Sequence, residues 1–240
     1  MGTLKPTLLM YASGLSQLLP PIVGVIGGRV ATPPRLWMVV WCLLLVANGA
    51  ISLALGMQNI NNLWVGYVFM PATGAVALWA LSSWHDPGTG RLALRLAIPL
   101  FVAVSAVLTL GVEDAHTFSL VAAPFHGLVL LIAAIWTFIR RSLGETAPLV
   151  RRDWFWAVAG LMLYAGTTTA LEPVAWYLLS TERVDLLNLA INAKAGSDIL
   201  AFGAITWGVL CPVPPKSSGG SSSPPSLPWA SLSDPSASRW

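Results

Sequence analysis

Long runs of apolar residues, separated by short polar joints, make up the first 211 residues of the chain. A helix that crosses about 30 Å of hydrocarbon needs roughly 20 mainly apolar residues, and seven runs reach this length. Their limits are Thr7–Gly28, Leu36–Gly56, Leu63–Ser83, Leu92–Gly111, Phe118–Ile139, Trp154–Leu179 and Leu186–Leu210. Because the runs are continuous and do not alternate with polar residues, they predict helices and not the strands of a membrane barrel.

The composition agrees with this pattern. Of the 240 residues, 55% are apolar and 10% are charged, whereas about a quarter of a soluble domain is charged. Two cysteines do not make a disulfide scaffold, and no basic patch indicates nucleic-acid binding. We therefore predict an all-α integral membrane bundle of seven transmembrane helices, with the lipid bilayer as its main partner and no nucleic-acid partner.

The composition changes at Pro212, after which Pro, Ser and Gly predominate. Such a segment cannot bury enough apolar surface to fold by itself. The chain is therefore predicted to consist of a seven-helix transmembrane domain, 1–211, and a disordered cytoplasmic tail, 212–240. The tail holds no enzymatic domain, so any signal would have to pass to a membrane or cytoplasmic partner protein.

Basic residues gather in alternate joints, and cytoplasmic loops are the ones that keep Lys and Arg. Ten basic residues fall on one side, against two on the other, Lys5 and Arg183. The ten are Arg29, Arg35, Arg91, Arg95, Arg140, Arg141, Arg151, Arg152, Lys216 and Arg239. The N-terminus is therefore predicted to lie outside the cell and the C-terminus in the cytoplasm.

Aromatic residues and glycines carry two further predictions. Most Trp and Tyr residues lie near the ends of the runs, as expected for an aromatic belt at the membrane surfaces. They are Trp37, Trp41, Trp64, Trp79, Trp84, Trp136, Trp154, Trp156, Trp176, Trp207, Tyr11, Tyr67 and Tyr177. Gly24 with Gly28, and Gly196 with Gly203, are spaced for close contact between helices.

Several polar residues remain inside the apolar runs at a similar depth, roughly 10–18 Å from the outer end at 1.5 Å per residue. They are Gln17, Asn48, His126, Glu172, Lys194 and Asp198, and Asn192 extends the polar face of the last run. A charged group at the centre of a membrane helix costs about 3 kcal/mol if it faces lipid. We therefore expect these side chains to point inward and to form one ligand-binding site.

Two interpretations of this layer stand side by side. In the first, Lys194 and Asp198, four residues apart, form an ion pair that only fixes the helix register, while His126 bonds a carbonyl and Glu172 extends to the interface. In the second, an outward-facing pocket binds a small polar ligand, an ion or a proton, as intramembrane ionisable residues usually do. The second predicts a receptor-like or sensory binding module. The alternatives are a small solute or proton-coupled transporter that uses His126, Lys194 and Asp198, and a structural subunit of a membrane complex.

Two resemblances concern the whole chain. Seven spans and a lysine in the last one resemble the microbial rhodopsins, which implies retinal at Lys194. The chain departs from that pattern at Ala190, where the family has aspartate, so no cofactor is expected unless Lys194 carries retinal. The segments NNLWVGYVFMPATG, RRDWFWAVAGLMLYAG and NAKAGSDILAFGAITWGVLCP resemble an uncharacterised family of bacterial seven-transmembrane proteins. That resemblance implies a multi-pass protein of the bacterial inner membrane and no particular activity.

Enzymatic motifs are missing from the sequence. No HxxxH or HExxH pattern occurs, so a metal hydrolase is not expected. Ser105 and His126 have compatible depths, but one serine and one histidine do not specify a hydrolase. We therefore predict no catalytic residues and no metal ligands.

Overall fold

The computed structural model describes residues 7–30, 32–114, 116–117, 119–146 and 148–212, and this part of the chain folds into helices without strands. The helices are α1 (Leu8–Ser16), α2 (Leu19–Ile26), α3 (Pro33–Met57), α4 (Leu63–Ser83), α5 (Thr89–Val107), α6 (Ala122–Leu143), α7 (Asp153–Ser180) and α8 (Val184–Leu210). A π-helical turn, η1 (Leu108–Val112), extends α5, and a 3-10 turn, η2 (Leu149–Arg151), precedes α7. The predicted all-helical class is confirmed. The predicted tail falls almost entirely on 213–240, outside the described residues.

The first predicted span is broken into α1 and α2. Pro20 and Pro21 have no backbone N–H to donate to the carbonyl groups one turn earlier, so a continuous helix cannot pass through them. The helix therefore stops at Ser16 and restarts at Leu19, with the two prolines in the first turn of α2. Both pieces pack along α8, and together they count as one of seven helical rods.

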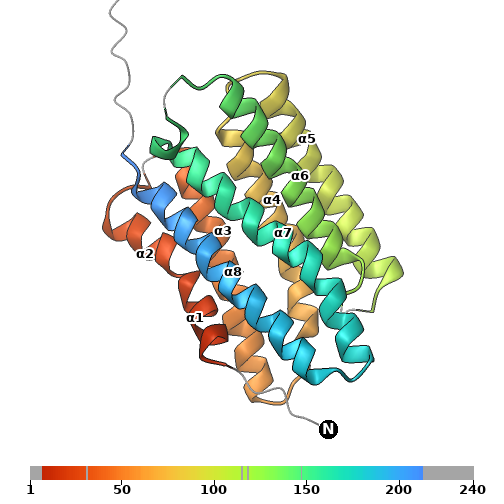
Figure 1. Cartoon of the computed structure of the whole chain (residues 1–240). Coiled ribbons are helices and arrows are strands. Elements are labelled where there is room, and N and C mark those ends of the chain that lie inside the picture. Colours follow the sequence, from red (N-terminus) through yellow and green to blue (C-terminus); the bar gives the residue numbers. More distant parts are fainter. Residues whose placement is uncertain (1–6, 31, 115, 118, 147, 213–240) are drawn as a thin grey trace, which may run out of the picture.

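The rods form a closed bundle in which neighbours in sequence are mostly neighbours in space (Figure 1). Contacts run from α2 to α3, then through α4, α5, α6 and α7 to α8, which returns to α1 and α2. The α4–α6 contact crosses the ring on one side. Short joints between antiparallel helices produce this order, because each helix must return beside the one before it.

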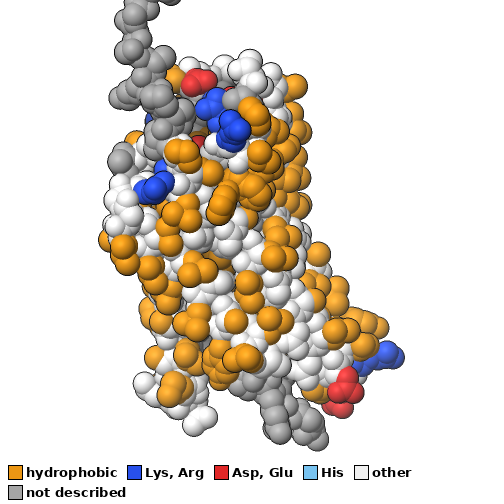
Figure 2. Space-filling view, turned by 60° about the vertical axis from the view of Figure 1, so that its left-hand side comes forward, with side chains coloured by type: hydrophobic (Ala, Val, Ile, Leu, Met, Phe, Trp, Pro, Cys, Tyr) orange, Lys and Arg blue, Asp and Glu red, His pale blue; other side chains and the backbone are white. Residues whose placement is uncertain are grey.

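Much of the bundle surface is apolar, as Figure 2 shows over the middle of one face. Leu100 and Leu200 are 66% and 68% exposed. Five segments are long and apolar enough to cross a membrane: Leu8–Ile26, Pro33–Met57, Leu63–Ser83, Thr89–Val112 and Ala122–Leu143. The fold therefore defines a helical, membrane-type bundle. The crossing of α7 and α8, and the orientation of the bundle, stay predictions.

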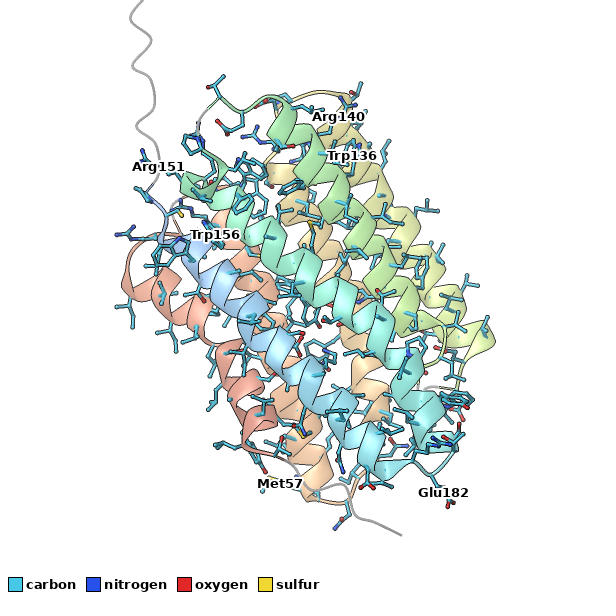
Figure 3. All side chains as sticks on the ribbon, in the orientation of Figure 1. Met57, Trp136, Arg140, Arg151, Trp156 and Glu182 are labelled. Atoms are coloured by element: carbon cyan, nitrogen blue, oxygen red, sulfur yellow. The ribbon has the colours of Figure 1, made fainter. Side chains whose placement is uncertain are left out.

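The two ends of the bundle differ. Figure 3 places Arg140 and Arg151 at one end, which we call the arginine end, and Met57 and Glu182 at the other, which we call the opposite end. The tightly packed core lies in the half next to the arginine end. Its fully buried side chains include Trp41, Leu78, Leu81, Leu161, Phe202 and Ile205.

Parts of the packing prediction are wrong. Four of the residues assigned to the aromatic belt are buried in the bundle and do not belong to a surface belt: Trp41 (0% exposed), Trp154 (2%), Tyr67 (4%) and Trp84 (8%). Trp41 packs its ring against Tyr164 and Phe202, with ring centroids 5.3 and 5.9 Å apart, so aromatic packing replaces an interfacial position.

The glycine prediction is correct only at Gly24, where an added Cβ would lie 3.1 Å from Val39. Gly196 and Gly203 face open space, and Gly28 adopts φ +59° in the turn after α2. Helices α7 and α8 approach instead at Gly160, where an added Cβ would lie 2.5 Å from the carbonyl oxygen of Ala201. The pair also approaches at Gly208 of α8, where an added Cβ would lie 2.9 Å from the carbonyl oxygen of Asp153, so close approach depends on a glycine in each helix.

Candidate functional site: a polar cavity between four helices

A cavity of about 220 Å³ lies between α3, α4, α6 and α7, in the half next to the opposite end. Three of the predicted site residues line it: Asn48 from α3, His126 from α6 and Glu172 from α7. Its other polar lining residues are Tyr67, Thr73, Thr117, Ser119, Tyr164 and Thr168. The structure thus brings together part of the predicted layer around one hollow.

Three atoms in this lining have hydrogen-bonding capacity that the protein does not use: Asn48 Oδ1, His126 Nε2 and Thr168 Oγ1, the last on α7. All three are buried, and none has a hydrogen-bond partner among the described residues. A buried polar group left unpaired costs about 1–3 kcal/mol. The bundle keeps these three groups at the edge of a cavity, where water or a ligand can satisfy them.

A close approach between helices fixes the position of His126. Its ring, 7% exposed, lies against Phe101 of α5 with ring centroids 5.7 Å apart. Gly74 of α4 makes room for both rings, since an added Cβ there would lie 2.3 Å from Phe101 and 3.1 Å from His126. The imidazole is therefore held between three helices at one wall of the cavity.

The joint between η1 and α6 contributes Thr117 and Ser119 to the cavity wall, and Glu113 holds this joint in place. Its carboxylate accepts hydrogen bonds from the backbone N–H groups of Leu120 (2.6 Å) and Val121 (2.5 Å) and from the Ser119 hydroxyl (3.0 Å). Partial burial acts to raise the pKa of Glu113, but these hydrogen bonds outweigh it, so the pKa lies below its usual value. The Tyr67 hydroxyl donates to the Thr117 carbonyl at 3.4 Å and ties α4 to the same joint.

Lys194 and Asp198 form an ion pair on α8, with Lys194 Nζ 3.0 Å from Asp198 Oδ2. The carboxylate is buried and also accepts a long hydrogen bond, 3.5 Å, from Ser13 of α1. The ammonium lies 5.2 Å from the ring centre of Tyr164, a cation–π contact. The pair therefore sits between α1 and α7, beside the break in the first rod, and neither residue lines the 220 Å³ cavity.

Two residues connect the ion pair with the cavity. Tyr164 lines the cavity and contacts Lys194 through its ring. Glu172 lines the cavity and also a mostly apolar groove of about 310 Å³ between α7 and α8, whose wall includes Lys194. The predicted layer is therefore two adjoining polar sites and not one.

The remaining predicted residues lie elsewhere. Gln17 is half-buried at the end of α1, outside the lining of the cavity. Asn192 accepts a hydrogen bond from the Thr7 hydroxyl at 2.6 Å, which fastens the start of α1 to α8. Depth put Gln17 with the other residues, and its place on the polar face of the last run put Asn192 there. Their side chains point in other directions around the helix axes, and this separates them from the residues that line the cavity.

Sequence reasoning missed the hydroxyl-bearing part of the lining. Thr73 and Tyr67 lie on α4, six residues apart, and both line the cavity. The Thr73 hydroxyl donates to the carbonyl of Phe69 at 2.9 Å, so the residue is compatible with an apolar run. A search for neutral hydroxyl groups at the depth of Asn48 would have found Thr73, whereas Tyr67 looked like part of the aromatic belt.

No cluster of three or more His, Cys, Asp or Glu side chains that could hold a metal ion occurs in the described part of the chain. Comparisons with family models, with curated proteins and with solved structures gave no match to this chain. The class that the fold supports is therefore a membrane-type helical bundle, and its function has to be argued from the site.

Proposed function

We propose that the protein is a receptor-like or sensory binding protein that takes a small polar molecule into the cavity between α3, α4, α6 and α7. The observation that carries this proposal is the set of buried, unpaired polar atoms at one cavity, Asn48 Oδ1, His126 Nε2 and Thr168 Oγ1. Each lies on a different helix. A ligand that bonds these groups would favour one arrangement of the three helices, which is what a sensor requires.

The lining indicates the chemistry of the ligand. Asn48 Oδ1 and the Glu172 carboxylate are acceptors, whereas the unpaired nitrogen of His126 accepts or donates according to its tautomer, so a molecule rich in hydrogen-bond donors, such as a small amine, fits best. The volume of about 220 Å³ is below the roughly 300–1,000 Å³ of typical small-molecule sites. The ligand is therefore smaller than a nucleotide.

A substitution that removes an unpaired group tests the proposal. For Asn48→Leu, which keeps the size and removes the polar atoms, we expect a higher unfolding temperature without ligand, because an unpaired buried acceptor costs about 1–3 kcal/mol. We also expect loss of any stabilisation by a fixed panel of small amines and amino acids at millimolar concentration. Thermal unfolding of the purified protein in detergent measures both effects.

Gln17→Leu is the matched control, because it makes the same chemical change at a half-buried position outside the cavity. This variant should keep the response to the panel. If Asn48→Leu lowers the unfolding temperature and no panel compound stabilises the wild-type protein, Asn48 has a structural role and the binding proposal is wrong.

A second candidate function, a proton-coupled carrier, is favoured by the broken first rod next to a buried ion pair. Discontinuous helices beside charged side chains are a recurring feature of secondary transporters. Here the gap between Ser16 and Leu19 lies next to Asp198, which Ser13 contacts. Proton or amine flux into liposomes that is lost in Lys194→Met together with Asp198→Leu would support this candidate. Unchanged flux would exclude it.

A further inference from the structure

A second and larger cavity, of about 560 Å³, opens at the arginine end. It lies between the joint from α4 to α5, the end of α6 and the start of α7. Its lining includes His85, Thr89, Arg140, Arg141, Glu145 and Arg152. The function proposed above uses none of these residues, so this cavity calls for an explanation of its own.

Two of the carboxylates in this cavity are already bound to arginines. Glu145 forms an ion pair with Arg152. Asp153 Oδ2 lies 3.0 Å from Nε of the buried Arg35. These acids therefore neutralise Arg152 and Arg35, and the exposed Asp86 is the remaining carboxylate in the described lining of the cavity.

Arg140 and Arg141 hold the charge that remains. Arg140 has no carboxylate within ion-pair distance in the described part of the chain, and its guanidinium lies 5.8 Å from the ring centre of Trp136. Arg141 is 3.7 Å from Asp86, but Asp86 is 94% exposed, and exposed pairs contribute little. The Nε of Arg141 is buried and has no hydrogen-bond partner among the described residues. Each guanidinium thus keeps donors for another acceptor.

The start of α5 faces the same cavity. Helix α5 begins at Thr89 after Gly88, which has no side chain to cap the first turn. The first N–H groups of a helix have no partner within it, and the helix dipole favours an anion there. Gly88, Thr89 and Gly90 all line the cavity, so small residues let a ligand approach this backbone.

The pKa of His85 is affected by its burial and by the positive charge of Arg141. Burial, and then the positive charge of Arg141, hold the pKa of His85 below its usual value, so the ring is neutral at pH 7. The ring stacks on Trp136, with centroids 5.1 Å apart, and hydrogen-bonds the Thr137 hydroxyl at 3.2 Å. It forms a flat, uncharged wall beside the two arginines.

We propose that this cavity binds a phosphate group through Arg140, Arg141 and the first turn of α5. Guanidinium groups match phosphate oxygens with paired hydrogen bonds, and an uncapped helix start adds backbone donors. The phosphate has two sources, the headgroup of an anionic phospholipid and a free phosphate compound. Basic cavities between transmembrane helices recognise lipid headgroups in this way.

The test measures binding to the purified full chain in detergent. Phosphatidylglycerol, phosphatidylcholine, inorganic phosphate and pyrophosphate are added separately, and retention is followed by native mass spectrometry and thermal unfolding. We expect saturable binding of phosphatidylglycerol or of a free phosphate. The expected loss is about tenfold or more in Arg140→Gln with Arg141→Gln, because two charge-assisted contacts disappear.

Arg151→Gln is the matched control, because Arg151 is an exposed arginine at the same end that does not line the cavity. Its affinity should stay within about twofold of wild type.

Preference for phosphatidylglycerol over phosphatidylcholine assigns the site to lipid, and saturable stabilisation by pyrophosphate assigns it to a free compound. Equal losses in Arg151→Gln and the double variant, or no binding of any probe by the wild-type protein, would overturn the proposal. If the double variant does not fold, Arg140→Gln alone, at an exposed position, provides the same comparison.

Discussion

The polar side chains of this bundle fall into two groups at the scale of single residues. Glu113, Arg35 and Asn192 have their hydrogen bonds met inside the protein and join segments that are distant in sequence. Asn48 Oδ1 and His126 Nε2 do not. The first group stabilises the fold, whereas the second group costs free energy unless water or a ligand in the cavity satisfies it.

The Glu113 carboxylate allows a pH prediction. Glu113→Gln should lower stability at pH 7 by about 1–2 kcal/mol, the difference between charged and neutral hydrogen bonds. Because the folded pKa is depressed, this contribution is fully present above the unfolded value of about 4.3 and is lost as the pH falls through the folded pKa. Thermal unfolding across pH 3–7 should therefore show the two proteins converging at acidic pH.

Glu182→Gln is the control for this experiment, since Glu182 is exposed at the same end of the bundle. This variant should unfold at the wild-type temperature throughout the range. A gap between wild type and Glu113→Gln that stays constant down to pH 3 would show that the charge of Glu113 does not hold the joint.

At the scale of helices, hydropathy predicted well where helices occur and how long they are. The predicted run Leu63–Ser83 coincides with α4, and Leu186–Leu210 is two residues shorter than α8. The break after Ser16 was not predicted, because a membrane helix tolerates a single proline. Two prolines in succession remove adjacent backbone hydrogen bonds, and this ends the helix. The direction of each side chain around its helix was also beyond hydropathy, which is why Gln17 and Asn48 were placed together.

The contact between α7 and α8 supports a prediction about Gly160. Alanine there would bring its Cβ within 2.5 Å of the Ala201 carbonyl oxygen, a backbone atom that cannot move alone. Overpacking of this kind costs about 1–3 kcal/mol, so Gly160→Ala should lower the unfolding temperature. Gly166→Ala lies on the same helix and meets only Leu131, at 3.8 Å. It should be neutral or stabilising, because Ala favours helix by about 1 kcal/mol over Gly. Similar stabilisation of both variants would show that α7 and α8 are not in contact at Gly160.

At the scale of the whole molecule, packing and charge are distributed unevenly along the bundle axis. The half next to the arginine end contains the densely packed aromatic and aliphatic core, and the half next to the opposite end contains the cavity with Asn48 and His126. A rigid half beside a hollow one lets a ligand move helix ends at one side while the other side stays fixed. The basic count along the sequence predicted which end carries the arginines, but the cavity depends on contacts that no residue count contains.

The same asymmetry predicts the orientation of the bundle. Cysteine labelling tests this orientation, and it also tests whether α7 and α8 cross the membrane, which hydropathy does not establish. Arg151 and Glu182 flank α7, and both are exposed. With Cys42 and Cys211 replaced by Ala, Glu182→Cys should react with a membrane-impermeant thiol reagent added to intact cells, because cytoplasmic loops retain Arg. Arg151→Cys should react only after the membrane is opened.

A third position separates the possible faults in this topology. Pro212, exposed after α8, should behave like Arg151 once it is changed to Cys, because α8 returns the chain to the arginine end. Reversed labelling at all three positions would keep the spans and invert the orientation. Equal labelling of Arg151→Cys and Glu182→Cys from one side would mean that α7 does not cross. In that case Glu172 would no longer lie at membrane depth, and its part in a binding site inside the membrane would have no physical basis.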